Sequence, residues 1–134
     1  MDSIFIIGAG RFGRALAARV AHDGREVVVM DRERRALETL PASFAGSAIQ
    51  GDARELEQLK NLGFAECGVV VAATHDDNLN LSIALAAGRM FAATRAMVLL
   101  RDPTRRSLFD AFDVEVLDPM GLAVGEAMQM GGWS

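Results

Sequence analysis

Three glycines near the N-terminus have the spacing of a phosphate-binding loop. They lie in the segment Gly8-Ala9-Gly10-Arg11-Phe12-Gly13, a GxGxxG pattern that connects an apolar run to a helical pattern. In that context the first glycine permits a tight turn, the second lets a phosphate approach the backbone, and the third lets the helix lie close to the strand. The backbone amides and the positive end of the helix dipole then attract an anion. The segment therefore predicts a phosphate site built from main-chain groups.

A carboxylate follows this loop at the position expected for a ribose contact. Asp31 comes directly after a β-branched run, 18 residues after Gly13. At that position a carboxylate can accept hydrogen bonds from both hydroxyls of an adenosine ribose, and it repels a 2′-phosphate. We therefore expect the cofactor to be NAD(H) or ATP/ADP rather than NADP.

Arginines beside both motifs leave alternatives open. Arg32, Arg34 and Arg35 follow the carboxylate, and an arginine at this place can accommodate a 2′-phosphate. We favour a solvated first helical turn for all three, because Asp31 itself disfavours that phosphate. Arg11 can reach a pyrophosphate or a terminal phosphate, but an exposed arginine at a helix start explains it equally well.

Six short apolar runs alternate with helical patterns along the chain. The expected strands are Ile4–Ile7, Val27–Met30, Ala48–Gln50, Val69–Ala73, Ala96–Leu100 and Val114–Leu117. The expected helices are Arg11–His22, Arg32–Leu40, a segment capped by Asp52 that runs to Gly63, Leu79–Arg89, Pro103–Phe109 and Pro119–Met130. Asp52 with Glu55 has the spacing of a capping box, and Asp76 or Asp77 caps the fourth helix. This order predicts one α/β domain over residues 1–134, a Rossmann-like doubly wound six-stranded parallel sheet with helices on both faces.

The composition excludes several classes of protein. The chain has 134 residues, 51% of them hydrophobic, and a formal net charge of −4. Because its basic residues are dispersed arginines, with Lys60 as the only lysine, we expect no nucleic-acid partner. Apolar stretches are interrupted well before the roughly 18–20 residues of a membrane span, so we expect no direct membrane insertion. Cys67 is the only cysteine, which leaves no internal disulfide and no thiolate metal site.

Beyond the glycine loop, several segments together resemble the N-terminal (TrkA-N) lobe of the RCK family, the regulators of potassium conductance. The resemblance is strongest to the Trk/Ktr-type regulatory subunits of potassium-uptake systems. The segments that carry it are Ile6–Gly13, Gly24–Asp31, Gly51-Asp52-Ala53, Val70–Thr74 with Asp77 and Asn80, and Leu100–Pro103. They cover nearly the whole chain in order, so the resemblance is more specific than the glycine motif.

The resemblance implies roles for further residues. It makes Arg11 a phosphate contact and Asp31 the ribose acceptor, and it places Asp52 and Ala53 beside the adenine. With the residues near the strand ends, the predicted cofactor site comprises Gly8, Gly10, Arg11, Phe12, Gly13, Asp31, Arg32, Asp52, Ala53, Ala73, Thr74, His75, Asn80 and Arg101. Simpler explanations remain open, because Asp52 can be a helix cap and Thr74, Asp77 and Asn80 can close a strand-to-helix turn.

The resemblance also implies assembly. Residues 79–87 are apolar on more than one face, and the tail carries Leu122, Val124, Met128, Met130 and Trp133. In the family the last helix, here about 119–130, crosses to a partner subunit; packing on its own sheet is the alternative. We therefore expect a homodimer or higher homo-oligomer that gates the membrane subunit of a potassium transporter or channel, at the cytoplasmic face of the plasma membrane. A second ligand-sensing lobe usually follows in the family, and none is contained in these 134 residues.

The competing hypothesis is the cofactor-binding domain of an NAD-dependent oxidoreductase. The sequence has no tyrosine, which removes the Tyr/Lys pair of short-chain dehydrogenases. Cys67 reads as a small buried residue, and His22 as a residue that ends a helix. His75 lies where ligands bind but has no evident partner for acid–base chemistry. We therefore expect a non-catalytic domain with no metal site.

Overall fold

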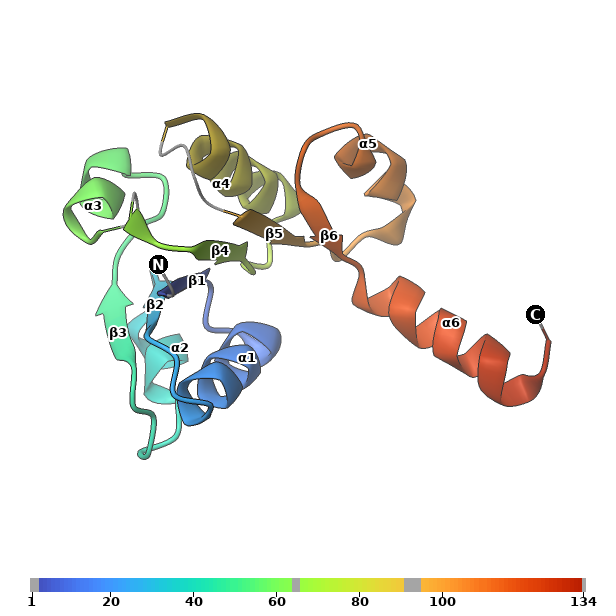
Figure 1. Cartoon of the computed structure of the whole chain (residues 1–134), viewed down its shortest axis with the longest axis horizontal. Coiled ribbons are helices and arrows are strands. Elements are labelled where there is room, and N and C mark those ends of the chain that lie inside the picture. Colours follow the sequence, from blue (N-terminus) through green and yellow to red (C-terminus); the bar gives the residue numbers. More distant parts are fainter. Residues whose placement is uncertain (1–2, 64–65, 91–94, 134) are drawn as a thin grey trace.

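The computed structural model describes residues 3–63, 66–90 and 95–133 and consists of a six-stranded parallel sheet with helices packed against it (Figure 1). All neighbouring strands are parallel, and their order is β3-β2-β1-β4-β5-β6. The strands are β1 (Ile4–Ile7), β2 (Val27–Asp31), β3 (Ser47–Gln50), β4 (Val69–Ala72), β5 (Arg95–Leu99) and β6 (Glu115–Leu117). The predicted Rossmann-like fold class is confirmed.

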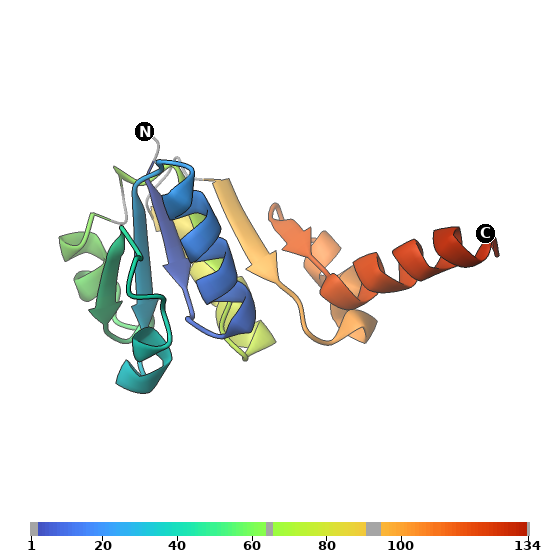
Figure 2. The same ribbon diagram turned by 90° about the horizontal axis from the view of Figure 1, so that it is seen from below.

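Helices cover both faces of the sheet (Figure 2). They are α1 (Arg11–His22), α2 (Arg34–Glu38), α3 (Leu56–Asn61), α4 (Asp77–Met90), the short 3₁₀ helix η2 (Pro103–Arg105), α5 (Arg106–Asp110) and α6 (Pro119–Gly131). Apolar side chains of α1 and α2 pack with one cluster of strand residues, and those of α3, α4 and α5 pack with the other. Because both faces are covered, the central strands are apolar throughout.

Alternation along the strands divides the core between these two layers. In β1, Phe5 and Ile7 face the α3/α4/α5 layer, while Ile6 faces the α1/α2 layer. Each of the three is at most 2% exposed. Successive side chains of a strand point to opposite faces, so four consecutive apolar residues are needed to bury one short strand. This explains why the strands appear in the sequence as unbroken apolar runs.

Several predicted helix boundaries were wrong. The second helix has only five residues, Arg34–Glu38, because the chain turns at Thr39 and Leu40 before Pro41. The third helix begins at Leu56, and its N-cap Glu55 makes no side-chain capping bond. Asp52 is therefore not a helix cap. Its Oδ1 accepts from the backbone N–H of Arg54 (3.0 Å), a local turn that competes with helix formation.

The first turn of α4 corrects a second boundary. The helix begins at Asp77 rather than Leu79. Of the two candidate caps it is Asp76 that acts as one, since its Oδ1 accepts from the backbone N–H of Leu79 at 3.1 Å. Within the segment predicted to be apolar on several faces, Ile83, Ala84 and Ala87 are buried against the sheet.

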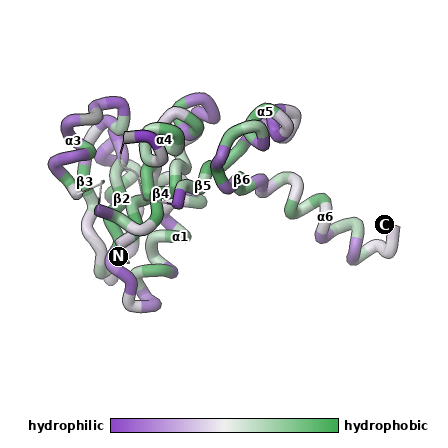
Figure 3. Tube along the Cα trace, turned by 45° about the horizontal axis from the view of Figure 1, so that its top comes forward, coloured by the Kyte–Doolittle hydropathy of each residue, from purple (hydrophilic) through white to green (hydrophobic). Residues whose placement is uncertain are grey.

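The last helix projects away from the sheet (Figures 1 and 2). Asp118 caps it by accepting from the backbone N–H of Gly121 (2.9 Å), and Gly132 ends it in the left-handed conformation. Every described residue of α6 is exposed. These exposed positions include apolar as well as polar residues along the length of the helix (Figure 3). The alternative that this helix packs on its own sheet is therefore wrong.

The junction of β1 and α1 has no room for side chains. Gly8 has φ = +110°, and a Cβ there would lie 2.5 Å from the carbonyl oxygen of Ala73. A Cβ on Gly13 would lie 1.9 Å from the carbonyl oxygen of Gly8. Since both obstacles are backbone atoms, neither contact can be relieved by rotating a side chain. Glycine at these positions lets α1 begin directly against the end of the sheet.

Gly13→Ala is expected to destabilise the domain by about 2–3 kcal/mol, because the methyl group forces α1 away from β1. Gly88→Ala is the matched control. Gly88 lies within α4 with nothing within 4 Å of an added Cβ, so alanine there should stabilise by about 0.5–1 kcal/mol through helix propensity. Urea unfolding measures both. Equal stability of the two variants would contradict the close contact of α1 with β1.

Candidate functional site

The candidate site is a cleft of about 650 Å³ at the carboxyl ends of the strands. It lies where the order of strands reverses between β1 and β4, the place where open α/β sheets bind ligands. Ten of the residues predicted from the sequence line it, namely Gly8, Gly10, Asp31, Arg32, Asp52, Ala53, Ala73, Thr74, His75 and Arg101. The fold thus brings together residues from the ends of five strands.

The remaining four predicted residues do not line the cleft. Arg11 is exposed in the first turn of α1, and Phe12 packs with the apolar layer under that helix. Gly13 is buried against Gly8. Asn80 is fully buried behind the cleft. Of these four residues, Arg11 alone is exposed to solvent, whereas Phe12 is half-buried and Gly13 and Asn80 are buried.

Gly10 forms the open floor of the glycine loop. It is the N-cap of α1, has an extended backbone (φ −73°, ψ −168°), and the first turn of the helix contains no acidic residue. The first amides of a helix have no partner within the helix, so those of α1 remain available to an anion. A Cβ on Gly10 would meet only Nη2 of Arg101, at 4.0 Å. The guanidinium of Arg101 therefore lies close to the loop.

Asp31 ties the glycine loop to the end of β2. Its Oδ2 accepts from the backbone N–H of Ala9 at 2.7 Å, and its Oδ1 accepts from the backbone N–H of Glu33 at 2.8 Å. Each carboxylate oxygen has a second acceptor position, so the group can still receive hydroxyl donors from the cleft. The same side chain thus shapes the loop and presents negative charge beside it.

Asn80 fixes the loop after β4 through four hydrogen bonds. Its Oδ1 accepts from the backbone N–H (2.9 Å) and the hydroxyl (2.6 Å) of Thr74, and its Nδ2 donates to the carbonyls of Thr74 (3.1 Å) and Leu99 (2.9 Å). All the polar atoms of this buried amide are used within the protein. The simpler explanation, that Thr74 and Asn80 close a strand-to-helix turn, is what the structure shows for these two residues.

Asp77 fixes the loop after β5 in the same way. Its carboxylate is buried and accepts from the backbone N–H groups of Arg101 (2.8 Å) and Asp102 (3.0 Å). The Arg101 side chain then turns back, and its Nε donates to the carbonyl of Thr74 at 3.2 Å. A cation is in this way held beside the glycine loop, where it can pair with a phosphate.

Asp52 forms an ion pair with Arg54 at the other end of the cleft. Arg54 donates through Nε to Oδ1 (3.0 Å) and Oδ2 (3.2 Å), and through Nη2 to Oδ2 (2.7 Å). These hydrogen bonds lower the pKa of Asp52 to about 2. Because the folded pKa is below the usual value of 3.8, the pair stabilises the fold above about pH 4, and that contribution is lost as the pH falls through about 2.

Sequence reasoning missed several lining residues. They are Glu33, Ala36, Gly51, Arg54, Asp76, Asn78, Leu79 and Ser82, together with Ile7 and Met30 at the strand ends. Most follow a predicted site residue by one to four positions, so the topology that located Asp31, Asp52 and Thr74 also identifies their neighbourhoods. Which side chain of each loop faces the cleft depends on turn geometry, and the sequence carries no periodic signal for it.

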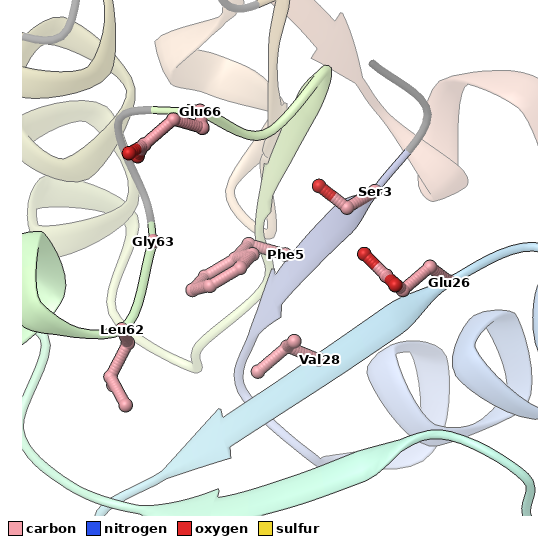
Figure 4. A pocket seen from close by; sticks show the side chains of 7 residues that line it. All are labelled: Ser3, Phe5, Glu26, Val28, Leu62, Gly63 and Glu66. Carbon is pink, nitrogen blue, oxygen red and sulfur yellow. The ribbon is translucent and has the colours of Figure 1, made fainter.

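A second cavity, of about 420 Å³, lies at the opposite, amino-terminal edge of the sheet (Figure 4). Its lining is Ser3, Phe5, Glu26, Val28, Leu62, Gly63 and Glu66. It contains none of the residues predicted to bind a nucleotide. Across the described ranges, no group of three or more His, Cys, Asp or Glu side chains is arranged to hold a metal ion. Cys67 is buried, as predicted.

The TrkA-N domain model matches residues 4–117, which is most of the chain. This chain belongs to the TrkA-N family. It is 34% identical over 133 residues to the Trk system potassium uptake protein TrkA of Mycobacterium tuberculosis, covering 96% of this chain and 60% of that protein. It is 31% identical over 111 residues to the protein of the same description from Streptomyces coelicolor, covering 83% of this chain and 50% of that protein. This TrkA-N chain thus spans about half to three fifths of the length of these relatives.

Solved structures show the same fold. The TrkA-N domain of the inner membrane protein ybaL from Escherichia coli superposes with a TM-score of 0.83 at 12% identity, over 96% of both chains. The GsuK channel bound to NAD gives 0.74 at 23% identity, over 88% of this chain and 21% of that one, and GsuK bound to ADP gives 0.76 at 22%, over 95% and 33%. The AMP-bound Kef C-terminal domain of Shewanella denitrificans gives 0.71 at 20%, over 99% and 83%. Among the described residues of this TrkA-N chain, no helix combines the length and hydropathy needed to cross a bilayer.

Asn80→Ala is expected to destabilise the TrkA-N domain by about 2–4 kcal/mol, because it removes the acceptor of the Thr74 backbone N–H and a donor to the carbonyls of Thr74 and Leu99. Asn61→Ala is the matched control, since Asn61 is exposed at the end of α3, and it should change stability by less than about 0.5 kcal/mol. Thermal and urea unfolding measure both. A loss of nucleotide binding in Asn80→Ala with unchanged stability would instead identify Asn80 as a direct ligand contact.

Proposed function

We propose that this chain is the nucleotide-binding domain of a regulator of potassium transport, and that its cleft binds NAD(H) or ATP/ADP. The observation that carries the proposal is the juxtaposition, in one cleft, of the open glycine floor at Gly10 with the carboxylate of Asp31. A nucleotide that places its phosphates on the loop brings its ribose to that carboxylate.

The charges around the cleft support an anionic ligand whose adenosine ribose carries no 2′-phosphate. The amides of α1 and the guanidinium of Arg101 lie at the phosphate end. Asp31 lies at the ribose end and disfavours a 2′-phosphate, although the exposed Arg32 lines the cleft beside it. The related GsuK and Kef structures with NAD, ADP and AMP support an adenine nucleotide without choosing between the dinucleotide and ATP/ADP.

A regulatory role is supported over a catalytic one by the chemistry of the cleft. His75 is the residue there that best suits proton transfer, and it is exposed, with no hydrogen-bonded partner among the described residues. A general acid or base works through a positioned partner and a substrate pocket. The cofactor-binding domain of an oxidoreductase is the second candidate, and substrate-dependent turnover of NADH by this chain would establish it.

The proposal extends to assembly. Along α6, Met120, Val124 and Met128 follow one another at intervals of four residues, and all three side chains are exposed on a helix that projects from the body. Such an exposed apolar stripe is typical of an interface. We propose that it buries against a second copy of this chain, and that the resulting homo-oligomer acts on a potassium transporter or channel at the cytoplasmic face of the membrane.

Gly10→Ala is expected to weaken nucleotide binding strongly without altering the fold. Its backbone suits any residue and the new methyl group contacts no other backbone, so stability should stay within about 0.5 kcal/mol of the wild type. The methyl group nevertheless occupies the place where the phosphates approach the loop. Calorimetric titration with NAD⁺, NADH, ADP, ATP and NADP⁺ should show the affinity reduced at least about tenfold.

Gly88→Ala is the control for this titration and should bind as the wild type does. Asp31→Asn removes the negative charge and, because an NH₂ group cannot accept, one of the two backbone hydrogen bonds of this side chain. It should weaken NAD⁺ and reduce the discrimination against NADP⁺. No binding of any adenine nucleotide by the wild type, or full binding by Gly10→Ala, would contradict the assignment of the site.

For the assembly, Val124→Glu is expected to raise the dissociation constant of the dimer at least about tenfold, because it buries a charge in the apolar stripe. Glu126→Gln, an exposed change on the same helix, should leave the dimer intact. Sedimentation velocity at micromolar concentration measures both. A wild-type chain that sediments as a monomer at high micromolar concentration would refute the dimer and leave the nucleotide site untouched.

A further inference from the structure

Arg54 lies at the end of the cleft that is farthest from the phosphate loop. The glycine loop follows β1, Asp31 ends β2, and Arg54 comes after β3, which is the edge strand of this half of the sheet. A nucleotide that extends from the loop through Asp31 therefore brings its base to the segment that contains Arg54. The side chain lines the cleft and is 58% exposed.

The pairing with Asp52 fixes the plane of this guanidinium. The carboxylate receives Nε and Nη2 of Arg54 together with the backbone N–H of the same residue, in four contacts of 2.7–3.2 Å. A fork of this kind restricts the guanidinium to one orientation, which a single contact does not achieve. The pKa of Arg54 is raised, first by its hydrogen bond to Asp52 and also by the charge of Asp76 on the loop after β4.

The same contacts occupy the acceptor positions of Asp52. A carboxylate has about four such positions, and three N–H groups of Arg54 already bond to this one, with that of Nε shared between both oxygens. The exocyclic amine of an adenine would therefore compete with the ion pair for the oxygens of Asp52. The face of the guanidinium, in contrast, makes no hydrogen bonds and remains available. Apolar surface of Ala53 and Leu79 lines the cleft nearby.

We propose that Arg54, held by Asp52, is the residue on which the base of the nucleotide stacks. The site then recognises the flat face of a purine rather than its hydrogen-bonding edge, because guanidinium planes stack on nucleobases without regard to their substituents. The inference rests on the proposed nucleotide site and adds a specificity: the cleft tolerates hypoxanthine in place of adenine.

Titration of the full chain with NAD⁺ and its hypoxanthine analogue, and with ADP and IDP, tests the specificity. In the wild type the two bases should differ by less than about threefold. If Asp52 instead received the exocyclic amine, replacing that amine by a carbonyl would cost more than about tenfold, and such a difference would overturn the proposal.

Arg54→Ala tests the stacking. It should weaken AMP, ADP and ATP by a similar factor, roughly three- to tenfold. By freeing Asp52 it should also raise the preference for adenine over hypoxanthine. Arg54→Lys keeps the charge but has no flat face, so it should not restore affinity. Full rescue by lysine, or a loss that grows from AMP to ATP, would show that Arg54 contacts phosphate and would overturn the proposal.

Arg95→Ala is the matched control, because Arg95 forms a similar exposed pair with Glu115 (2.7 Å) on β5 and β6, outside the cleft. It should bind every nucleotide as the wild type does. The wild-type titration distinguishes failure of the proposed nucleotide site from failure of the proposed stacking on Arg54. Absence of binding there refutes the nucleotide site itself, whereas normal binding by both wild type and Arg54→Ala refutes only the stacking role.

Discussion

The shape of the cleft depends on two buried polar side chains in the first turn of α4. Asp77 and Asn80 hold the loops after β4 and β5 by accepting or donating hydrogen bonds to their backbones. Loops of this kind have few apolar contacts, and their buried backbone groups must be satisfied by some partner. One helical turn supplies these partners for both loops. Asp77 holds the backbone of Arg101, whose side chain reaches Thr74 and lies near Gly10.

The architecture of the sheet could be predicted from the sequence, whereas the roles of single polar residues at the ends of the strands could not. Strand order, the two-sided helical cover and the location of the cleft follow from alternating apolar runs and from the rule that parallel crossovers are right-handed. The sequence located Asp31 and Gly10 in the cleft because both lie at or just after the carboxyl ends of strands that form it. For Asn80 the sequence left a cofactor contact and a turn-closing role open, since a polar residue near a strand end looks the same in sequence whether it faces the cleft or the loop behind it.

The errors at helix starts have a related cause. Asp52 and Glu55 have the spacing of a capping box, yet Asp52 bonds to Arg54, two residues on, and the helix begins at Leu56. A short aspartate side chain can satisfy either a helix or a turn, and here the guanidinium of Arg54 decides for the turn by pairing with the same carboxylate. The spacing of Asp52 and Glu55 predicts a capping box but takes no account of Arg54, which lies between them. The consequence reaches the site, because the turn directs both side chains toward the cleft.

A chain of polar contacts runs from the cleft to the residue that caps the exposed helix α6. Asn78 lines the cleft and accepts a hydrogen bond from Arg105 in η2. The next residue, Arg106, lies 3.6 Å from the carboxylate of Asp118, which caps α6. A ligand acts on such a connection only through different affinities for two arrangements of it. Phe109 of α5 also packs in the same apolar cluster as Leu100 at the end of β5, so both polar contacts and a packed core join the loop after β5 to the segment that leads to α6.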